Sequence, residues 1–208
     1  MSKFISILTS RLAGSRLLTV GVFALLALLM IATRPYHFAS VLTLPSASLA
    51  VFFICGLLRS SHRMFAAFFV LSVLIDLASS YARGAFGDCI TPSYPFLVVG
   101  YYVMWWAGLK SFNLTQAMTV TDWTRQYAQS LLMLWLASSI AFLTSNGSYY
   151  WLSGKFAELS VAQYAERVVQ YYVPYVQSPF VYVIFAMMTA TGCYYLLPTW
   201  QRREQSDE

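Results

Sequence analysis

Apolar residues along this chain gather in six long runs separated by short polar stretches. The runs cover residues 17–33, 41–58, 64–82, 92–109, 127–144 and 175–197. A helix needs about 20 mostly apolar residues to cross a hydrocarbon core of about 30 Å, and each run approaches that length. The pattern therefore predicts six transmembrane helices.

The composition agrees with a membrane protein. Hydrophobic residues make up 59% of the 208 residues and charged residues only 10%, which is outside the usual range for a soluble domain. Basic residues precede the first run, as in a signal peptide, but that run ends in Met30-Ile31-Ala32-Thr33-Arg34 without a small-x-small cleavage site. We therefore expect it to be retained, in an all-α integral membrane protein with one membrane domain over residues 1–208.

The basic residues predict the orientation of the six helices. With the N-terminus in the cytoplasm, the inner side receives Lys3, Arg11, Arg16, Arg59, Arg63, Lys110, Arg125, Arg202 and Arg203, and the outer side receives Arg34, Arg83, Lys155 and Arg167. Cytoplasmic loops are enriched in Lys and Arg, so we expect both termini to be cytoplasmic. The net charge of +5 then reflects topology and attraction to anionic lipid rather than nucleic-acid binding.

The last outer connection, residues 145–174, is too long for a simple link. Ser160 followed by Gln163 resembles a capping box, and apolar residues follow it at helical spacing. We expect a short amphipathic helix over the outer mouth, ended by Pro174, which would serve either as a lid or as an interfacial seal. Residues 145–154 combine small polar and aromatic side chains, as the entrance of a pocket for a large ligand would, or as a turn followed by belt aromatics.

Cys89 is the residue with the most distinctive chemistry. It lies in the outer connection 83–91, whereas Cys55 and Cys193 lie toward the cytoplasmic ends of their helices as small apolar side chains. The bilayer separates Cys89 from both, which excludes a shared metal or disulfide. The neighbouring Asp88 opposes thiolate formation, whereas coordination to a metal deprotonates a thiol directly. The sequence therefore favours a metal-capturing cysteine over a self-activated nucleophile.

Four other residues in the outer half are candidates for ligand binding. Asp76 is the only acid within a predicted helix, and its insertion cost of about 2.5–3.5 kcal/mol predicts that it faces the interior. His37, Tyr94 and Arg167 lie on the same side of the membrane. Simpler interpretations are an interfacial histidine, an aromatic-belt tyrosine, and an arginine paired with a glutamate of its own helix.

Several function classes lack their sequence motifs. The chain has no Gly-rich phosphate-binding loop, so we expect no ATP hydrolysis by this chain. It has no pair of histidines at helical spacing for haem and no signature of a zinc protease, a thioredoxin-like protein or an α/β-hydrolase. These patterns favour a small binding subunit.

A compact six-helix chain of this length, with an outer ligand site and no ATPase, resembles the substrate-binding S component of an energy-coupling factor (ECF) vitamin transporter. Its outer residues resemble the solitary cobalamin-specific branch of that class. The resemblance matches Cys89 to a cysteine that ligates the cobalt of cobalamin. It also matches His37, Asp76, Tyr94 and, most loosely, Arg167 to residues of the ligand site.

The resemblance implies a multi-pass protein of the bacterial inner membrane that takes up cobalamin, with Cys89 replacing an upper axial ligand such as cyanide on cobalt. It also implies an ECF energising module, made of a transmembrane coupling protein and ATPases, as partner. The family's small-residue docking pattern is interrupted here by Leu28. A membrane thiol enzyme, an assembly subunit and an S component for another vitamin remain alternatives.

Overall fold

The computed structural model describes residues 16–34, 46–82, 84, 91–111, 120–157 and 160–196. In these residues all secondary structure is helical, so the prediction of an all-helical chain is confirmed for them. The elements are α2 (Arg16–Thr33), α3 (Ser48–Leu57), α4 (His62–Ala82), the 3₁₀ helix η1 (Tyr94–Phe96), α6 (Leu97–Ser111), α7 (Val120–Leu152) and α8 (Val161–Leu196).

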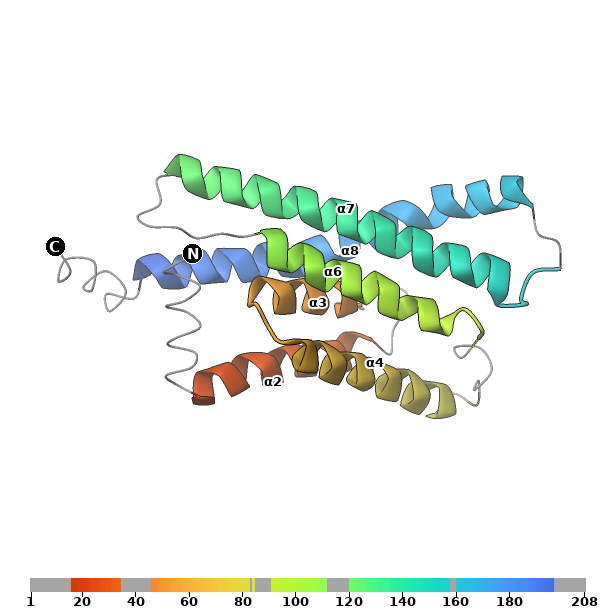
Figure 1. Cartoon of the computed structure of the whole chain (residues 1–208), viewed down its shortest axis with the longest axis horizontal. Coiled ribbons are helices and arrows are strands. Elements are labelled where there is room, and N and C mark those ends of the chain that lie inside the picture. The colour runs from red at the N-terminus through yellow and green to blue at the C-terminus, as the bar shows by residue number, and fades with distance from the viewer. Residues whose placement is uncertain are drawn as a thin grey trace.

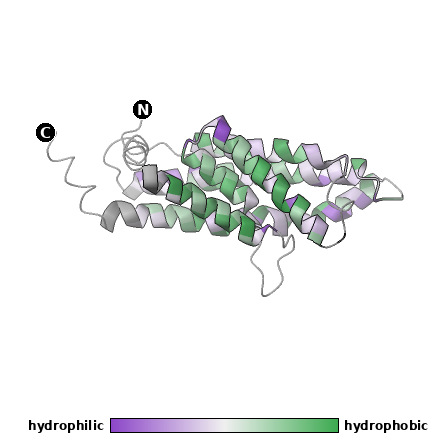
Figure 2. Ribbon diagram, turned by 90° about the horizontal axis from the view of Figure 1, so that it is seen from below, coloured by the Kyte–Doolittle hydropathy of each residue, from purple (hydrophilic) through white to green (hydrophobic). Residues whose placement is uncertain are grey.

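Three of these helices are long and apolar enough to cross a membrane. They are α4, α7 over Thr121–Leu152 and α8 over Val161–Gly192, while Thr19–Thr33 and Ser48–Leu57 are shorter apolar helices. Large apolar side chains such as Val20 and Leu74 are exposed on the outside of the bundle. Figure 2 shows hydrophobic residues along most of the length of the helices. These features indicate a membrane protein, whose outer surface would face lipid.

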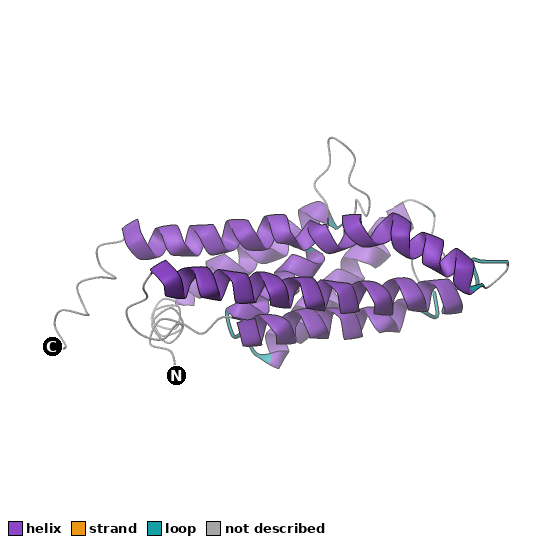
Figure 3. Ribbon diagram, turned by 90° about the horizontal axis from the view of Figure 1, so that it is seen from above, coloured by secondary structure: helices purple, strands orange, loops and turns teal. Residues whose placement is uncertain are grey.

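The helices run side by side in an elongated bundle, as Figures 1 and 3 show from two directions. The short helix α3 lies in its middle, in contact with α2, α4, α6 and α8. Nine of its ten residues are buried, which fits a helix that is apolar on all sides. The core therefore forms around α3.

Two glycines allow α3 and α6 to lie unusually close together. A Cβ atom added at Gly56 would lie 2.9 Å from the Cα of Gly108, and one added at Gly108 would lie 3.0 Å from the Cα of Gly56. The same atoms would also collide with the backbone carbonyls of Trp105 and Phe53. Small residues at such crossings let helix backbones pack directly, which substitutes for a hydrophobic driving force in lipid.

The predicted outer loop over residues 145–174 is wrong. Residues 145–152 complete α7, and the connection to α8 is short. No separate amphipathic helix ends at Pro174, because α8 continues through both Pro174 and Pro179. The predicted ranges 127–144 and 175–197 were therefore too narrow for α7 and began too late for α8.

The helix α8 tolerates its prolines because breaking a helix in apolar surroundings would leave more backbone groups without partners. Pro179 cannot donate a hydrogen bond to the carbonyl of Tyr175, but the hydroxyl of Ser178 donates to that oxygen at 3.0 Å. One side chain thus replaces the missing backbone donor.

The predicted start of a helix at Ser160 is confirmed. The Ser160 hydroxyl accepts a hydrogen bond from the backbone N–H of Gln163 at 3.2 Å, as an N-cap does. The reciprocal half of the capping box is supplied by Tyr150 of α7, whose hydroxyl accepts from the Ser160 N–H at 2.8 Å and lies 3.2 Å from Gln163 Oε1. The end of α7 therefore fixes the beginning of α8.

The fourth apolar run begins later as a helix than predicted. In the second run, the described helix α3 starts at Ser48, and the predicted start at residue 41 lies outside the described part of the chain. In the fourth run a turn after Thr91 and the 3₁₀ helix η1 precede α6. Pro92 and Pro95 explain that entry, because each lacks the N–H that a helix interior would use.

Candidate functional site

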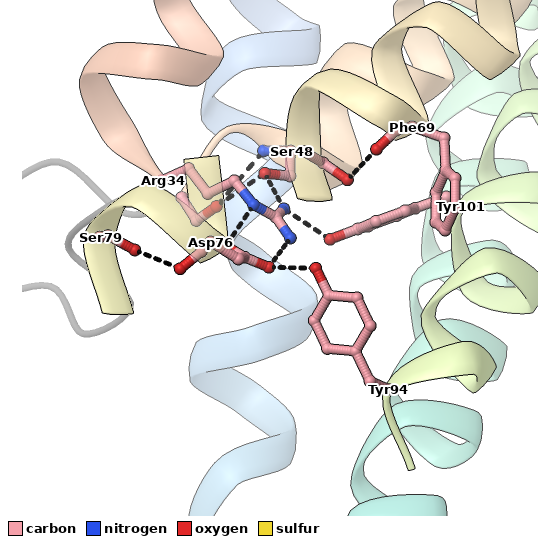
Figure 4. A network of polar contacts seen from close by, with 9 residues as sticks. Arg34, Ser48, Phe69, Asp76, Ser79, Tyr94 and Tyr101 are labelled. Carbon is pink, nitrogen blue, oxygen red and sulfur yellow. Dashed lines mark hydrogen bonds and ion pairs between the residues drawn. The ribbon is translucent and has the colours of Figure 1, made fainter. Parts of the chain in front are cut away.

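A buried ion pair between Arg34 and Asp76 forms the centre of the polar site (Figure 4). Arg34 directly follows α2, and its Nε and Nη2 atoms donate to Oδ1 and Oδ2 of Asp76 at 2.7 and 2.6 Å. Both residues are 3% exposed. The two parallel bonds fix the plane of the carboxylate relative to the guanidinium, which is the strongest geometry for such a pair.

Arg34 also binds the two helices on its other side. Its Nη1 atom donates to the hydroxyl of Ser48 at 2.8 Å and to that of Tyr101 at 2.6 Å. The Tyr101 ring stacks on Phe52 of α3, with ring centroids 4.4 Å apart. One guanidinium therefore joins the end of α2 to the start of α3, to α4 and to α6.

Tyr94 completes the network from the 3₁₀ helix η1. Its hydroxyl donates to Asp76 Oδ2 at 2.8 Å, and its side chain points into the cluster in Figure 4. The turn before it is held by a hydrogen bond from the Tyr94 N–H to the Thr91 carbonyl at 2.9 Å and by a bond between the Thr91 and Ser93 hydroxyls at 2.6 Å. Tyr94 is half-buried, whereas the other four members of the network are buried.

The charges of the network balance. Burial lowers the pKa of Arg34, but the interactions with Tyr101 and Asp76 raise it by more, so that pKa stays above its ordinary value and the guanidinium remains charged. The Asp76 carboxylate accepts hydrogen bonds from Arg34 and Tyr94. This arrangement contains no free base or nucleophile; what it does is hold the Tyr94 hydroxyl in one orientation.

The structure brings together two of the five predicted site residues. Asp76 faces the interior, as its cost in a membrane predicts, and it contacts Tyr94. Arg167 lies elsewhere, in the first turns of α8, with its guanidinium carbon 4.7 Å from the ring centroid of Phe156 and 5.1 Å from that of Tyr171. Cys89 and His37 lie outside the described residues.

Three members of the network, Arg34, Ser48 and Tyr101, were not predicted as site residues. Arg34 was named only as a basic residue of an outer connection, and nothing in the sequence pattern singled out Ser48 or Tyr101. The available signal was Asp76 itself, because a carboxylate inside a membrane helix requires a cationic or hydrogen-bonding partner. Arg34, which follows another helix and was predicted on the same side of the membrane, was one of the candidates for that partner.

A shallow groove of about 340 Å³ lies beside η1, between its last residue and the C-terminal part of α7. It is lined by Phe96, Leu143, Thr144, Gly147, Ser148, Trp151 and Leu152. Several of these belong to the stretch 145–154, for which the sequence allowed either a pocket entrance or a turn followed by belt aromatics; its residues 145–152 are helical. Its walls are largely apolar, which suits the flank of a hydrophobic ligand.

The described residues contain no group of three or more His, Cys, Asp and Glu side chains that could hold a metal ion. A metal recognised by a single protein ligand would have to arrive with its other ligands already in place. No protein-family model matches this chain, and no curated protein matches its sequence.

Proposed function

We propose that this chain takes up cobalamin across a bacterial inner membrane, as a six-helix protein with both termini in the cytoplasm and its ligand site on the outer side. The contact between Asp76 and Tyr94 is the observation that carries the proposal. The two residues are separated by a predicted outer connection, and both belong to the small set that resembles a cobalamin-specific S component.

The position of the contact suits a site built around Cys89. Tyr94 comes five residues after Cys89, and Asp76 lies in the helix that precedes it. The ion pair and the tyrosine therefore fix the chain on both sides of the segment that contains the cysteine. A chain segment between two fixed points has less conformational freedom to lose when a ligand binds to it.

The proposed chemistry is a ligand exchange on cobalt. The Cys89 thiolate forms a Co–S bond as the Co–CN bond breaks, and the thiol proton leaves with the cyanide as HCN, without any change in oxidation state. A soft thiolate suits this exchange. Cys89 would thereby bind cobalamin and remove its upper cyanide.

The other candidates would orient the corrin ring. His37 and Arg167 remain proposed ligand contacts, and Tyr94 is half-buried and able to reach a ligand. Asp76 is buried and already bonded to Arg34 and Tyr94, so we assign it an indirect role through Tyr94. The apolar groove beside η1 could receive part of the ligand's apolar surface.

An ECF energising module is the proposed partner, with no nucleic acid involved. On α2, a side chain at Gly21 would meet no atom within 4 Å, so a helix of a coupling protein could approach there closely. Co-purification with the coupling protein and its ATPases tests this part.

The absorbance spectrum of the purified protein tests the main proposal, because a bound corrinoid is coloured. We expect the wild-type protein to bind cyanocobalamin with a changed spectrum and to release cyanide, and Cys89→Ser to lose both effects. Cys55→Ala is the matched control, because Cys55 is buried in α3 and should leave the spectrum unchanged. A wild-type protein that binds no corrinoid, or a Cys89→Ser protein that behaves like wild type, would refute the proposal and favour a thiol enzyme or another vitamin.

A further inference from the structure

The hydroxyl of Tyr94 can form only one kind of hydrogen bond with a ligand. A phenol has one hydrogen to donate, and that hydrogen is used in the 2.8 Å bond to Asp76 Oδ2. The carboxylate cannot be the donor, because its two oxygens already accept from Nε and Nη2 of Arg34. The oxygen of Tyr94 thus keeps only acceptor capacity.

Arg34 determines the direction of the hydrogen bond between Tyr94 and Asp76. Its two bonds to the carboxylate leave Oδ2 oriented toward Tyr94. Ser48 and Tyr101 accept from the remaining nitrogen, Nη1, and hold the guanidinium from the opposite side. All four of these residues are buried, so Tyr94 is the member of the network through which a ligand would meet it.

We propose that Arg34 is a positioning residue that, through Asp76, presents Tyr94 as a hydrogen-bond acceptor and so makes the site select a ligand amide over a carboxylate. The inference rests on the proposed function, because the periphery of cobalamin carries primary amides. An amide N–H can donate to the Tyr94 oxygen. A carboxylate at the same place has no hydrogen and would meet an oxygen lone pair, with the charge of Asp76 behind it.

Binding of corrinoids that each have one peripheral amide replaced by a carboxylate tests the inference. For the wild-type protein we expect at least one position at which the amide form binds about tenfold or more tightly than the carboxylate form, the equivalent of about 1.4 kcal/mol. Tyr94→Phe should reduce that ratio to near one while leaving the ion pair of Arg34 intact. A merely structural role for the network would not change such a ratio.

The same amide-to-carboxylate binding ratio, measured for Arg34→Lys, is the second test. Lysine keeps the charge but cannot bond both carboxylate oxygens in one plane, so Oδ2 is no longer held toward Tyr94, and the ratio should fall between those of wild type and Tyr94→Phe. Tyr127→Phe is the matched control, because it removes a 2.6 Å hydroxyl contact with Thr191 between α7 and α8, away from this network, and should keep the wild-type ratio.

The outcomes separate the two proposals. If the wild-type protein binds none of the corrinoids, the proposed function fails and takes this inference with it. If the wild-type protein binds them and Tyr94→Phe shows the same amide-to-carboxylate ratios as wild type, the inference alone is wrong and the proposed function stands. The Tyr94→Phe result decides the matter even if Arg34→Lys does not fold.

Discussion

At the scale of single residues, the burial of Arg34 and that of Asp76 depend on each other, because each charge compensates the other. Removing one partner of a buried ion pair leaves the other charge without compensation, at a cost of about 3–5 kcal/mol. We therefore expect Asp76→Asn to lower the free energy of unfolding by about that amount. Chemical unfolding in detergent, followed by tryptophan fluorescence, measures it. Glu166→Gln, at an exposed position of α8, should change the same free energy by less than about 0.5 kcal/mol.

The double variant Arg34→Met with Asp76→Leu separates charge from packing. Replacing both partners of a buried pair by apolar residues of similar size is often nearly neutral, so the double variant should be more stable than Asp76→Asn. If the double variant is as unstable as Asp76→Asn, the network contributes to stability through its packing and hydrogen-bond geometry rather than through charge compensation.

The sequence could predict the position of Asp76 in this site, and the reason is the cost of a charge in a membrane. An isolated carboxylate in an apolar helix is so costly that Asp76 had to face the interior, and it does. The identity of its partner depends on where α2 ends relative to α4, which is a matter of tertiary packing that no local pattern contains. Arg34 was therefore missed, although its side of the membrane was predicted.

At the scale of helices, the crossing of α3 and α6 depends on Gly56 and Gly108. Alanine at either position would place a methyl group against backbone atoms of the other helix, which cannot rotate away as a side chain could. We expect each substitution to reduce the free energy of unfolding by about 1–3 kcal/mol. The same unfolding measurement applies, and Gly21→Ala is the control, because its methyl group meets open space. Equal stability of all three variants would contradict the close packing.

The helix α8 offers a second prediction, on Ser178 and Pro179. Ser178→Ala should cost about 1–2 kcal/mol, because it leaves the Tyr175 carbonyl without its donor in a membrane helix. In a Pro179→Ala background the restored backbone N–H can serve that carbonyl, so the cost of Ser178→Ala should become small. A double-mutant cycle of unfolding free energies measures the coupling; additive effects would mean that the Ser178 bond contributes nothing.

The apolar runs predicted the positions of the helices more accurately than the residues at which the helices begin and end. Pro174 was taken as the end of a short helix, because an isolated chain would break there. In the folded chain the Tyr150 hydroxyl and the Ser160 cap fix the start of α8, and α8 then runs on through Pro174. Contacts between α7 and α8, rather than local propensity, therefore decide these ends.

At the scale of the whole molecule, the bundle has two ends that the proposed topology assigns to opposite sides of the membrane. Figure 1 shows the connection between α3 and α4 far from that between α7 and α8. Ser61 is exposed in the first connection and Ala157 in the second. The distribution of basic residues predicts that the first lies inside and the second outside.

Cysteine labelling of whole cells tests this assignment. In a background with Cys55, Cys89 and Cys193 changed to alanine, a membrane-impermeant maleimide should label Ala157→Cys in intact cells. It should label Ser61→Cys only after the membrane is permeabilised. The reverse pattern would mean an inverted protein, with Asp76 and Tyr94 at the cytoplasmic end. Labelling of both positions in intact cells would mean that the two connections share one side, which six spans cannot produce. Because uptake from outside requires the network to lie at the outer end, either result would also remove the basis for cobalamin entry beside Tyr94.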